Sequence, residues 1–123
     1  MCEVDINFLQ SYADAWNAHD IDTLMNCMTE DCIFETGGGS DSWGTRFTGQ
    51  ADVRQRFESV WQDVPDAKWS ECKHFIAGDR GLSEWLFTGT APDGTVIAIQ
   101  GCDVFTFRDG MILIKSTYLK QKQ

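Results

Sequence analysis

Apolar side chains near the start of the chain recur with the period of an α-helix. They place one hydrophobic stripe along the segment from Asp5 to about Ala18 and predict an amphipathic helix there. Asp20 can act as the N-cap of a second, shorter helix. The residues of the two stripes are Val4, Phe8, Leu9, Tyr12 and Trp16, followed by Ile21, Leu24, Met25 and Met28.

The middle of the chain combines a short strand, a loop and a third helix. The pattern predicts a strand from Cys32 to Thr36. It is followed by a glycine-rich loop from Gly37 to Gly44 that carries Trp43. That loop lacks the Gly-Lys-Ser/Thr ending of a phosphate-binding loop, so we interpret it as a flexible pocket rim. A third apolar stripe predicts a helix from Gln50 that ends before Pro65.

After Pro65 the pattern changes to strands separated by turns rich in glycine and aspartate. Helices followed by a meander of strands indicate an α+β fold rather than a parallel α/β sheet. The predicted strands are Ala67 to Ile76, Leu82 to Thr88, Thr95 to Phe107, and Met111 to Leu119.

The last predicted hairpin places an acidic residue on an apolar face. A two-residue Asp109-Gly110 turn pairs Arg108 with Met111. Strand alternation then puts Asp103 inside with Phe105, Phe107, Ile112, Ile114, Ser116 and Tyr118. The other face, a candidate dimer interface, receives Cys102, Val104, Thr106, Leu113, Lys115, Thr117 and Leu119. A bulge would exchange the positions of Thr117 and Tyr118.

An ionised carboxylate among apolar side chains must find hydrogen-bond donors or take up a proton. Either state is useful in a catalytic pocket, although a structural role for Asp103 is the alternative. Tyr12 is a second candidate, and also a candidate core residue. His74 either lines the pocket or forms satisfied hydrogen bonds within a strand.

The composition of the chain limits the kinds of partner and the cellular location that we expect. The 123 residues suit one domain spanning 1–123, and the net charge of −9 disfavours nucleic acid. No apolar run approaches the length of a membrane span, and the start of the chain does not resemble a signal peptide. Five scattered cysteines without a CxxC pair fit reduced thiols. We therefore expect a cytoplasmic protein with no metal and no cofactor.

Several segments together resemble the SnoaL-like proteins of the nuclear transport factor two-like superfamily. They are Tyr12 to Leu24, Glu30 to Glu35, Gly49 to Arg54 and Gly101 to Gly110. The resemblance implies a cystatin-like cone, in which about three helices close the concave side of a curved antiparallel sheet. It also implies a homodimer formed through the outer sheet face.

The same resemblance suggests roles for single residues. Relative to ketosteroid isomerase, Tyr12 and Asp103 fall at the two oxyanion donors, whereas Thr36 stands where that enzyme has its general base. Ordinary ketosteroid isomerisation is therefore not expected. Epoxide hydrolysis is not expected either, because Gly101 replaces the arginine that it requires. A polyketide cyclase needs only one pocket aspartate, which Asp103 can provide.

The residues and the resemblance together predict a cofactor-independent lyase, cyclase or isomerase that acts on a small hydrophobic carbonyl compound. Asp103 would be its acid/base or oxyanion donor and Tyr12 a second donor. The expected pocket walls are Trp16, Thr36, Trp43, Phe57, His74, Trp85, Phe105 and Tyr118. A ligand-binding domain without chemistry and a structural dimer with a filled pocket are the alternatives.

Overall fold

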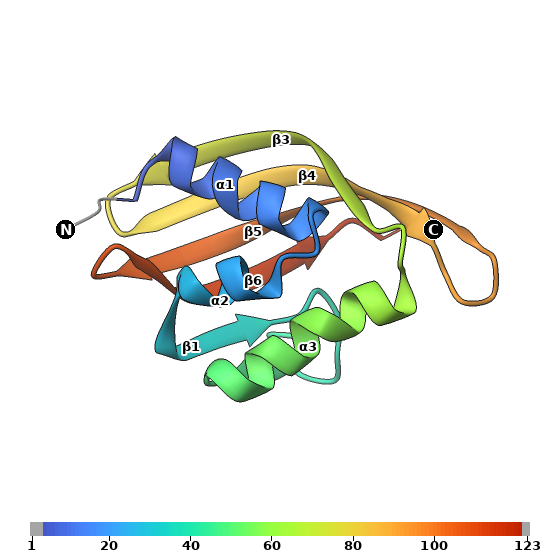
Figure 1. The fold of residues 1–123 in the computed structure, drawn as a ribbon, viewed down its shortest axis with the longest axis horizontal. Coiled ribbons are helices and arrows are strands. Elements are labelled where there is room, and N and C mark those ends of the chain that lie inside the picture. The colour runs from blue at the N-terminus through green and yellow to red at the C-terminus, as the bar shows by residue number, and fades with distance from the viewer. Residues whose placement is uncertain (1–3, 122–123) are drawn as a thin grey trace.

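The computed structural model describes residues 4–121, which form three helices and a six-stranded sheet. The helices are α1 (Ile6–Asn17), α2 (Ile21–Asn26) and α3 (Gln50–Asp63). All three lie against one face of the curved sheet (Figure 1). The predicted α+β architecture is confirmed. None of the helices within the described residues is long and apolar enough to cross a membrane.

The starts of α1 and α2 follow from side-chain caps. The carboxylate of Asp5 accepts a hydrogen bond from the backbone N–H of Phe8 at 2.8 Å, and Asp20 caps α2 through the N–H of Thr23 at 3.2 Å. Each cap satisfies a backbone donor that the first helical turn leaves free. Helix α3 ends at Asp63, two residues before Pro65, as its sequence predicts.

The sheet has the strand order β2-β1-β6-β5-β4-β3. Its strands are β1 (Met28–Glu35), β2 (Arg46–Thr48), β3 (Lys68–Ala77), β4 (Arg80–Thr90), β5 (Val96–Arg108) and β6 (Met111–Leu119). Only the β1–β6 pair is parallel among the described strands. The sequence pattern missed β2 because three residues are too few to show alternation.

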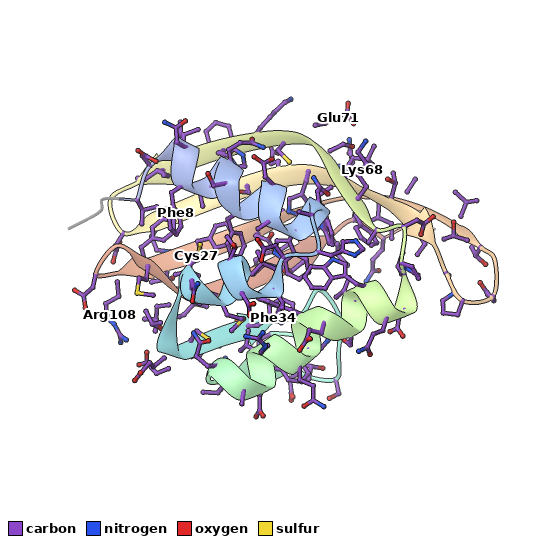
Figure 2. The ribbon with its side chains drawn as sticks, viewed as in Figure 1. Phe8, Cys27, Phe34, Lys68, Glu71 and Arg108 are labelled. Atoms are coloured by element: carbon purple, nitrogen blue, oxygen red, sulfur yellow. The ribbon has the colours of Figure 1, made fainter. Side chains whose placement is uncertain are left out.

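The helices cover different parts of the inner sheet face. Helix α1 lies over β3 and β4, and α3 lies over β1 (Figure 1). The core between these layers is rich in aromatic side chains, and Phe34 is one of them. Figure 2 shows Phe34 among the crowded side chains between sheet and helices, whereas Glu71 and Arg108 lie at the molecular edge.

The β5–β6 hairpin contains a bulge that corrects the predicted faces. Arg108 pairs with Met111 as predicted, but Phe107 pairs with Ile112 while Thr106 pairs with Ile114. Leu113 is therefore an extra residue in β6, and the face of each later residue is reversed. The inner face receives Lys115, Thr117 and Leu119, and the outer face receives Ile114, Ser116 and Tyr118. The bulge lies outside the turn, so the turn alone could not predict it.

Gly81 provides a test of how tightly the inner face is packed. A Cβ atom at this position would lie 2.7 Å from the ring of Phe107, whereas a Cβ atom at Gly38 would meet nothing within 4 Å. We expect Gly81→Ala to lower the free energy of unfolding by about 1–3 kcal/mol, because the ring must move. Urea denaturation measures this, with Gly38→Ala as the control. Equal effects of the two substitutions would contradict the packing argument.

Candidate functional site

A cavity of about 230 Å³ lies between the helices and the inner face of the sheet. Its walls are mostly apolar, and α1, α3 and the strands β1, β3, β4, β5 and β6 all contribute to them. Six of the ten residues predicted for the site line it. They are Tyr12, Trp16, Thr36, Trp85, Asp103 and Phe105.

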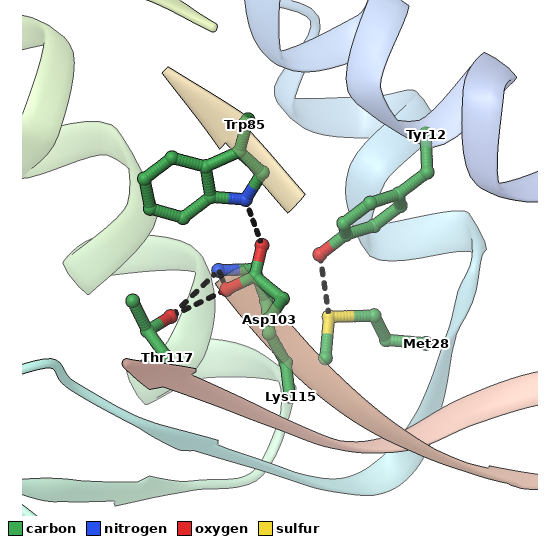
Figure 3. A network of polar contacts seen from close by, with 6 residues as sticks. All are labelled: Tyr12, Met28, Trp85, Asp103, Lys115 and Thr117. Carbon is green, nitrogen blue, oxygen red and sulfur yellow. Dashed lines mark hydrogen bonds and ion pairs between the residues drawn. The ribbon is translucent and has the colours of Figure 1, made fainter. Parts of the chain in front are cut away.

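Asp103 is held by three hydrogen-bond donors in this cavity (Figure 3). Its Oδ1 atom accepts from Lys115 Nζ at 3.0 Å and from the Thr117 hydroxyl at 2.6 Å. Its Oδ2 atom accepts only the indole N–H of Trp85, at 3.0 Å. All three contacts are donated to the carboxylate, and one of the three donors is the ammonium of Lys115. Because each oxygen has two lone pairs, Oδ2 keeps one acceptor site free.

Lys115 is the main side chain that the sequence pattern placed on the wrong face. Only 7% of its side chain is exposed, against 9% for that of Asp103. Its Nζ atom also lies 4.6 Å from the ring centroid of Phe34 and 5.4 Å from that of Trp16. An ammonium over aromatic faces is stabilised by the ring quadrupoles. The buried charge therefore has both a carboxylate partner and aromatic neighbours.

Tyr12 and Trp16 contribute two donors that lack strong acceptors. The Tyr12 hydroxyl donates to the thioether sulfur of Met28 at 3.6 Å and not to Asp103 (Figure 3). The buried indole N–H of Trp16 has no acceptor among the described residues. Burial raises the pKa of Tyr12 well above its usual value of 10.0, and the charge of Asp103 raises it further. The phenol thus keeps its proton as a donor.

Ser83, His74 and Gln10 form a chain of hydrogen bonds from the cavity to the surface. His74 Nε2 lies 2.8 Å from Gln10 Oε1, and His74 Nδ1 lies 2.8 Å from the hydroxyl oxygen of Ser83. The amide group of Gln10 is oriented by Asp14, which accepts from its Nε2 at 2.9 Å. An amide oxygen only accepts, so Nε2 of His74 carries the proton. Neutral His74 then accepts the hydroxyl proton of Ser83, which presents lone pairs to the cavity.

Four predicted wall residues lie elsewhere. Trp43 is 41% exposed and lies beneath the guanidinium of Arg46. Phe57 is fully buried behind the cavity wall, with its ring 4.7 Å from that of Trp16. His74 is covered by α1 and forms satisfied hydrogen bonds, which is the alternative that the sequence left open. Tyr118 is on the outer face because of the bulge at Leu113.

Several lining residues were missed by the sequence pattern. Lys115 and Thr117 were missed because the bulge reverses their strand, and Trp69 because β3 has its own irregularity between Ser70 and Lys73. Arg56 could have been found. It lies three residues after Val53 and four before Val60, so it borders the apolar stripe of α3 at helical spacing.

The site offers little to a metal ion. Within residues 4–121, no three His, Cys, Asp or Glu side chains gather where a metal could be held. Asp103 is occupied by Lys115, and Thr36 uses its hydroxyl inside the loop, donating to the carbonyl of Gly38 at 2.7 Å. The arrangement is suited to binding a small molecule and to moving protons by side chains.

Comparison with protein families gives one match to most of the chain. The SnoaL-like domain family matches residues 9–114, which run from within α1 to within β6 and include α2, α3 and the glycine-rich loop. No curated protein matches the sequence significantly.

Solved structures match the whole fold at low sequence identity. A putative polyketide cyclase from Xanthomonas campestris pv. campestris is 21% identical, with a TM-score of 0.79 over 89% of this chain and 85% of that one. A cystatin-like protein of unknown function from Xanthomonas campestris is also 21% identical, with a TM-score of 0.82 and coverages of 94% and 90%. A putative isomerase from Bacillus subtilis is 16% identical, with a TM-score of 0.76 and coverages of 91% and 83%. At these identities the likeness establishes a shared fold.

The buried ion pair leads to a prediction about stability. Lys115→Met and Asp103→Asn should each lower the free energy of unfolding by about 3–5 kcal/mol, because each leaves one buried group without its partner. The double variant should lose less stability than the two single variants added together, because both of its introduced side chains are neutral. Urea denaturation of the four proteins measures the coupling, and Lys73→Met on the exposed outer face is the control. Additive losses would contradict a direct interaction.

His74 gives a prediction about pH. Burial lowers the pKa of His74 from its usual value of 6.5, although the charge of Asp14 opposes this. His74 therefore binds a proton more readily in the unfolded chain than in the folded protein. The free energy of unfolding should fall as the pH drops below about 6.5 towards the folded-state pKa of His74. NMR titration of the imidazole and urea denaturation at several pH values measure both effects. The His74→Gln variant should lose this part of the pH dependence, and a pKa at or above 6.5 would contradict the prediction.

Proposed function

Since this chain belongs to the SnoaL-like domain family, we propose that its cavity catalyses proton transfer at a carbon atom next to a carbonyl group. The observation that carries the proposal is the free acceptor site on Asp103 Oδ2, in an apolar cavity whose lining also includes Trp16, with an indole N–H that has no acceptor among the described residues. The substrate would be a small hydrophobic carbonyl compound, and the reaction that of a lyase, cyclase or isomerase.

Asp103 would act as the general base. The C–H bond next to the carbonyl breaks, its proton moves to Oδ2, and its electron pair forms an enolate. Lys115 and Thr117 hold Oδ1, so the carboxylate keeps one orientation towards the substrate. A positioned base of this kind contributes about 10²–10⁴-fold to a rate.

Tyr12 and Trp16 would bind the carbonyl oxygen. Both side chains line the cavity, and neither of their donors has a strong acceptor within residues 4–121. A buried N–H without an acceptor costs about 1–3 kcal/mol, a cost that a ligand oxygen would remove. Donors aimed at the oxygen stabilise the enolate more than the ketone, because charge develops there.

The fate of the enolate separates the reaction classes. Return of the proton to another carbon is an isomerisation, attack on a second carbonyl is a cyclisation, and loss of a leaving group is a lyase reaction. Ser83 would take part by accepting a hydrogen bond from a substrate hydroxyl, since its own proton is donated to His74. All three classes share the first proton transfer.

Binding without chemistry is the second candidate, and one observation favours it. Among the described residues that line the cavity, Asp103 supplies the sole carboxylate, and three protein donors already occupy it. Thr36, at the place of the base in ketosteroid isomerase, is committed to the glycine-rich loop. Such a cavity would hold a small ligand by shape and a few hydrogen bonds.

Deuterium exchange tests the proposed function without knowledge of the natural substrate. Small ketones such as phenylacetone and 2-tetralone are incubated with the protein in D₂O, and NMR follows deuterium entering next to the carbonyl. We expect the protein to accelerate exchange, and Asp103→Asn to remove about 10²–10⁴-fold of it. Trp16→Phe, which lacks the N–H, should lower the rate by about tenfold, as expected for one lost hydrogen bond to a developing charge.

Two further variants make this experiment decisive. The double variant Asp103→Asn with Lys115→Met keeps a neutral pair, so it separates loss of the base from loss of the fold. Asp63→Asn changes the same charge at an exposed position that does not line the cavity, and it should leave exchange intact. Binding of the ketones without accelerated exchange would favour the second candidate. Exchange that survives in both Asp103 variants would exclude Asp103 as the base.

A further inference from the structure

We propose that the cavity binds an organic monocarboxylate, and that Arg56 on α3 holds its carboxylate group. Arg56 is half-buried and lines the same cavity as Asp103 and Lys115. Helix α3 lies over β1 (Figure 1), whereas the ion pair belongs to β5 and β6. The side chain was not among the residues predicted for the site.

The guanidinium of Arg56 has spare hydrogen-bonding capacity. Of its five N–H donors, one is used, by Nη1 to the hydroxyl of Ser59 at 2.7 Å. Among the described residues no carboxylate lies within ion-pair distance of it, whereas Arg46, Arg54 and Arg108 all have acidic partners. The planar fork matches the two oxygens of a carboxylate.

The charges of the cavity favour an anion. Asp103 and Lys115 neutralise each other at 3.0 Å, so Arg56 is the uncompensated charge among the described lining residues. The cavity therefore carries one net positive charge in a chain whose total is −9. A single positive charge matches a monoanion, and partial burial strengthens the attraction relative to an exposed arginine.

The walls define the rest of the ligand. The interior is lined by apolar side chains that include Leu9, Phe87 and Phe105, so the body of the ligand is apolar. A volume of about 230 Å³ accommodates one small ring system with a short chain. Combined with proton transfer beside a carbonyl, the substrate would be an oxo acid with an aromatic or alicyclic body. That last step rests on the proposed function, whereas the carboxylate site does not.

A matched pair of probes tests the site without any turnover. Hydrocinnamate is an apolar ring with a carboxylate, and hydrocinnamamide is its neutral counterpart of the same shape. Both are titrated into ¹⁵N-labelled protein, and NMR gives the affinity and the perturbed residues. We expect the carboxylate to bind about 10- to 100-fold more tightly, the range for a hydrogen-bonded ion pair. The chemical-shift changes caused by the carboxylate should be largest in residues that line the cavity, including Gly37, Val60 and Leu119.

Variants in α3 identify the residue responsible. Arg56→Gln should remove the preference for the carboxylate, and Arg56→Lys should keep part of it, because the charge stays and the fork is lost. Arg54→Gln is the matched control, since it removes the same charge from the same helix at a position that does not line the cavity. Circular dichroism verifies that each variant is folded.

Three results would overturn the carboxylate site. They are equal affinity for the acid and the amide, equal effects of Arg56→Gln and Arg54→Gln, and perturbed residues outside the cavity. The first would mean that Arg56 recognises no anion, and the second that only the total charge matters. Failure of the proposed function is distinct from these results, because it concerns deuterium exchange of neutral ketones and depends on Asp103.

Discussion

The ion pair between Asp103 and Lys115 depends on one extra residue in a strand. Without the bulge at Leu113, Lys115 and Thr117 would lie on the outer face, and Asp103 would be an uncompensated charge among aromatic rings. Such a carboxylate would have to take up a proton or unfold its surroundings. The bulge therefore determines whether the buried acid is a donor or an acceptor, and here it makes Asp103 an acceptor.

The cavity combines this pair with an apolar wall. Aromatic rings surround the ammonium of Lys115, and they exclude the water that would otherwise weaken the pair. The polar groups that line the cavity differ in which hydrogen-bonding capacity they leave unused. Within residues 4–121, Asp103 keeps a free lone pair, Trp16 a free N–H and Arg56 most of its donors. A ligand with an oxygen acceptor, an acidic proton and a negative end would satisfy these groups.

The architecture explains how one fold can support several kinds of reaction. The helices and the curved sheet create the enclosed space, and some residues that line it, such as Arg56, Ser83 and Thr117, do not belong to the hydrophobic core. Substitutions at lining positions can therefore change chemistry while the fold persists. In this chain the Thr36 hydroxyl is bound within the glycine-rich loop, and Asp103 is the carboxylate that lines the cavity among the described residues.

The sequence by itself determined the helices, the later strands, the α+β class and the inward position of Asp103, because apolar periodicity and turn residues are local signals. It also placed Tyr12, Trp16 and Trp85 where they line the cavity. Tertiary structure alone decided which partners Asp103 has. Strand register beyond a bulge is set by packing across the sheet, so the inward turn of Lys115 has no local signal.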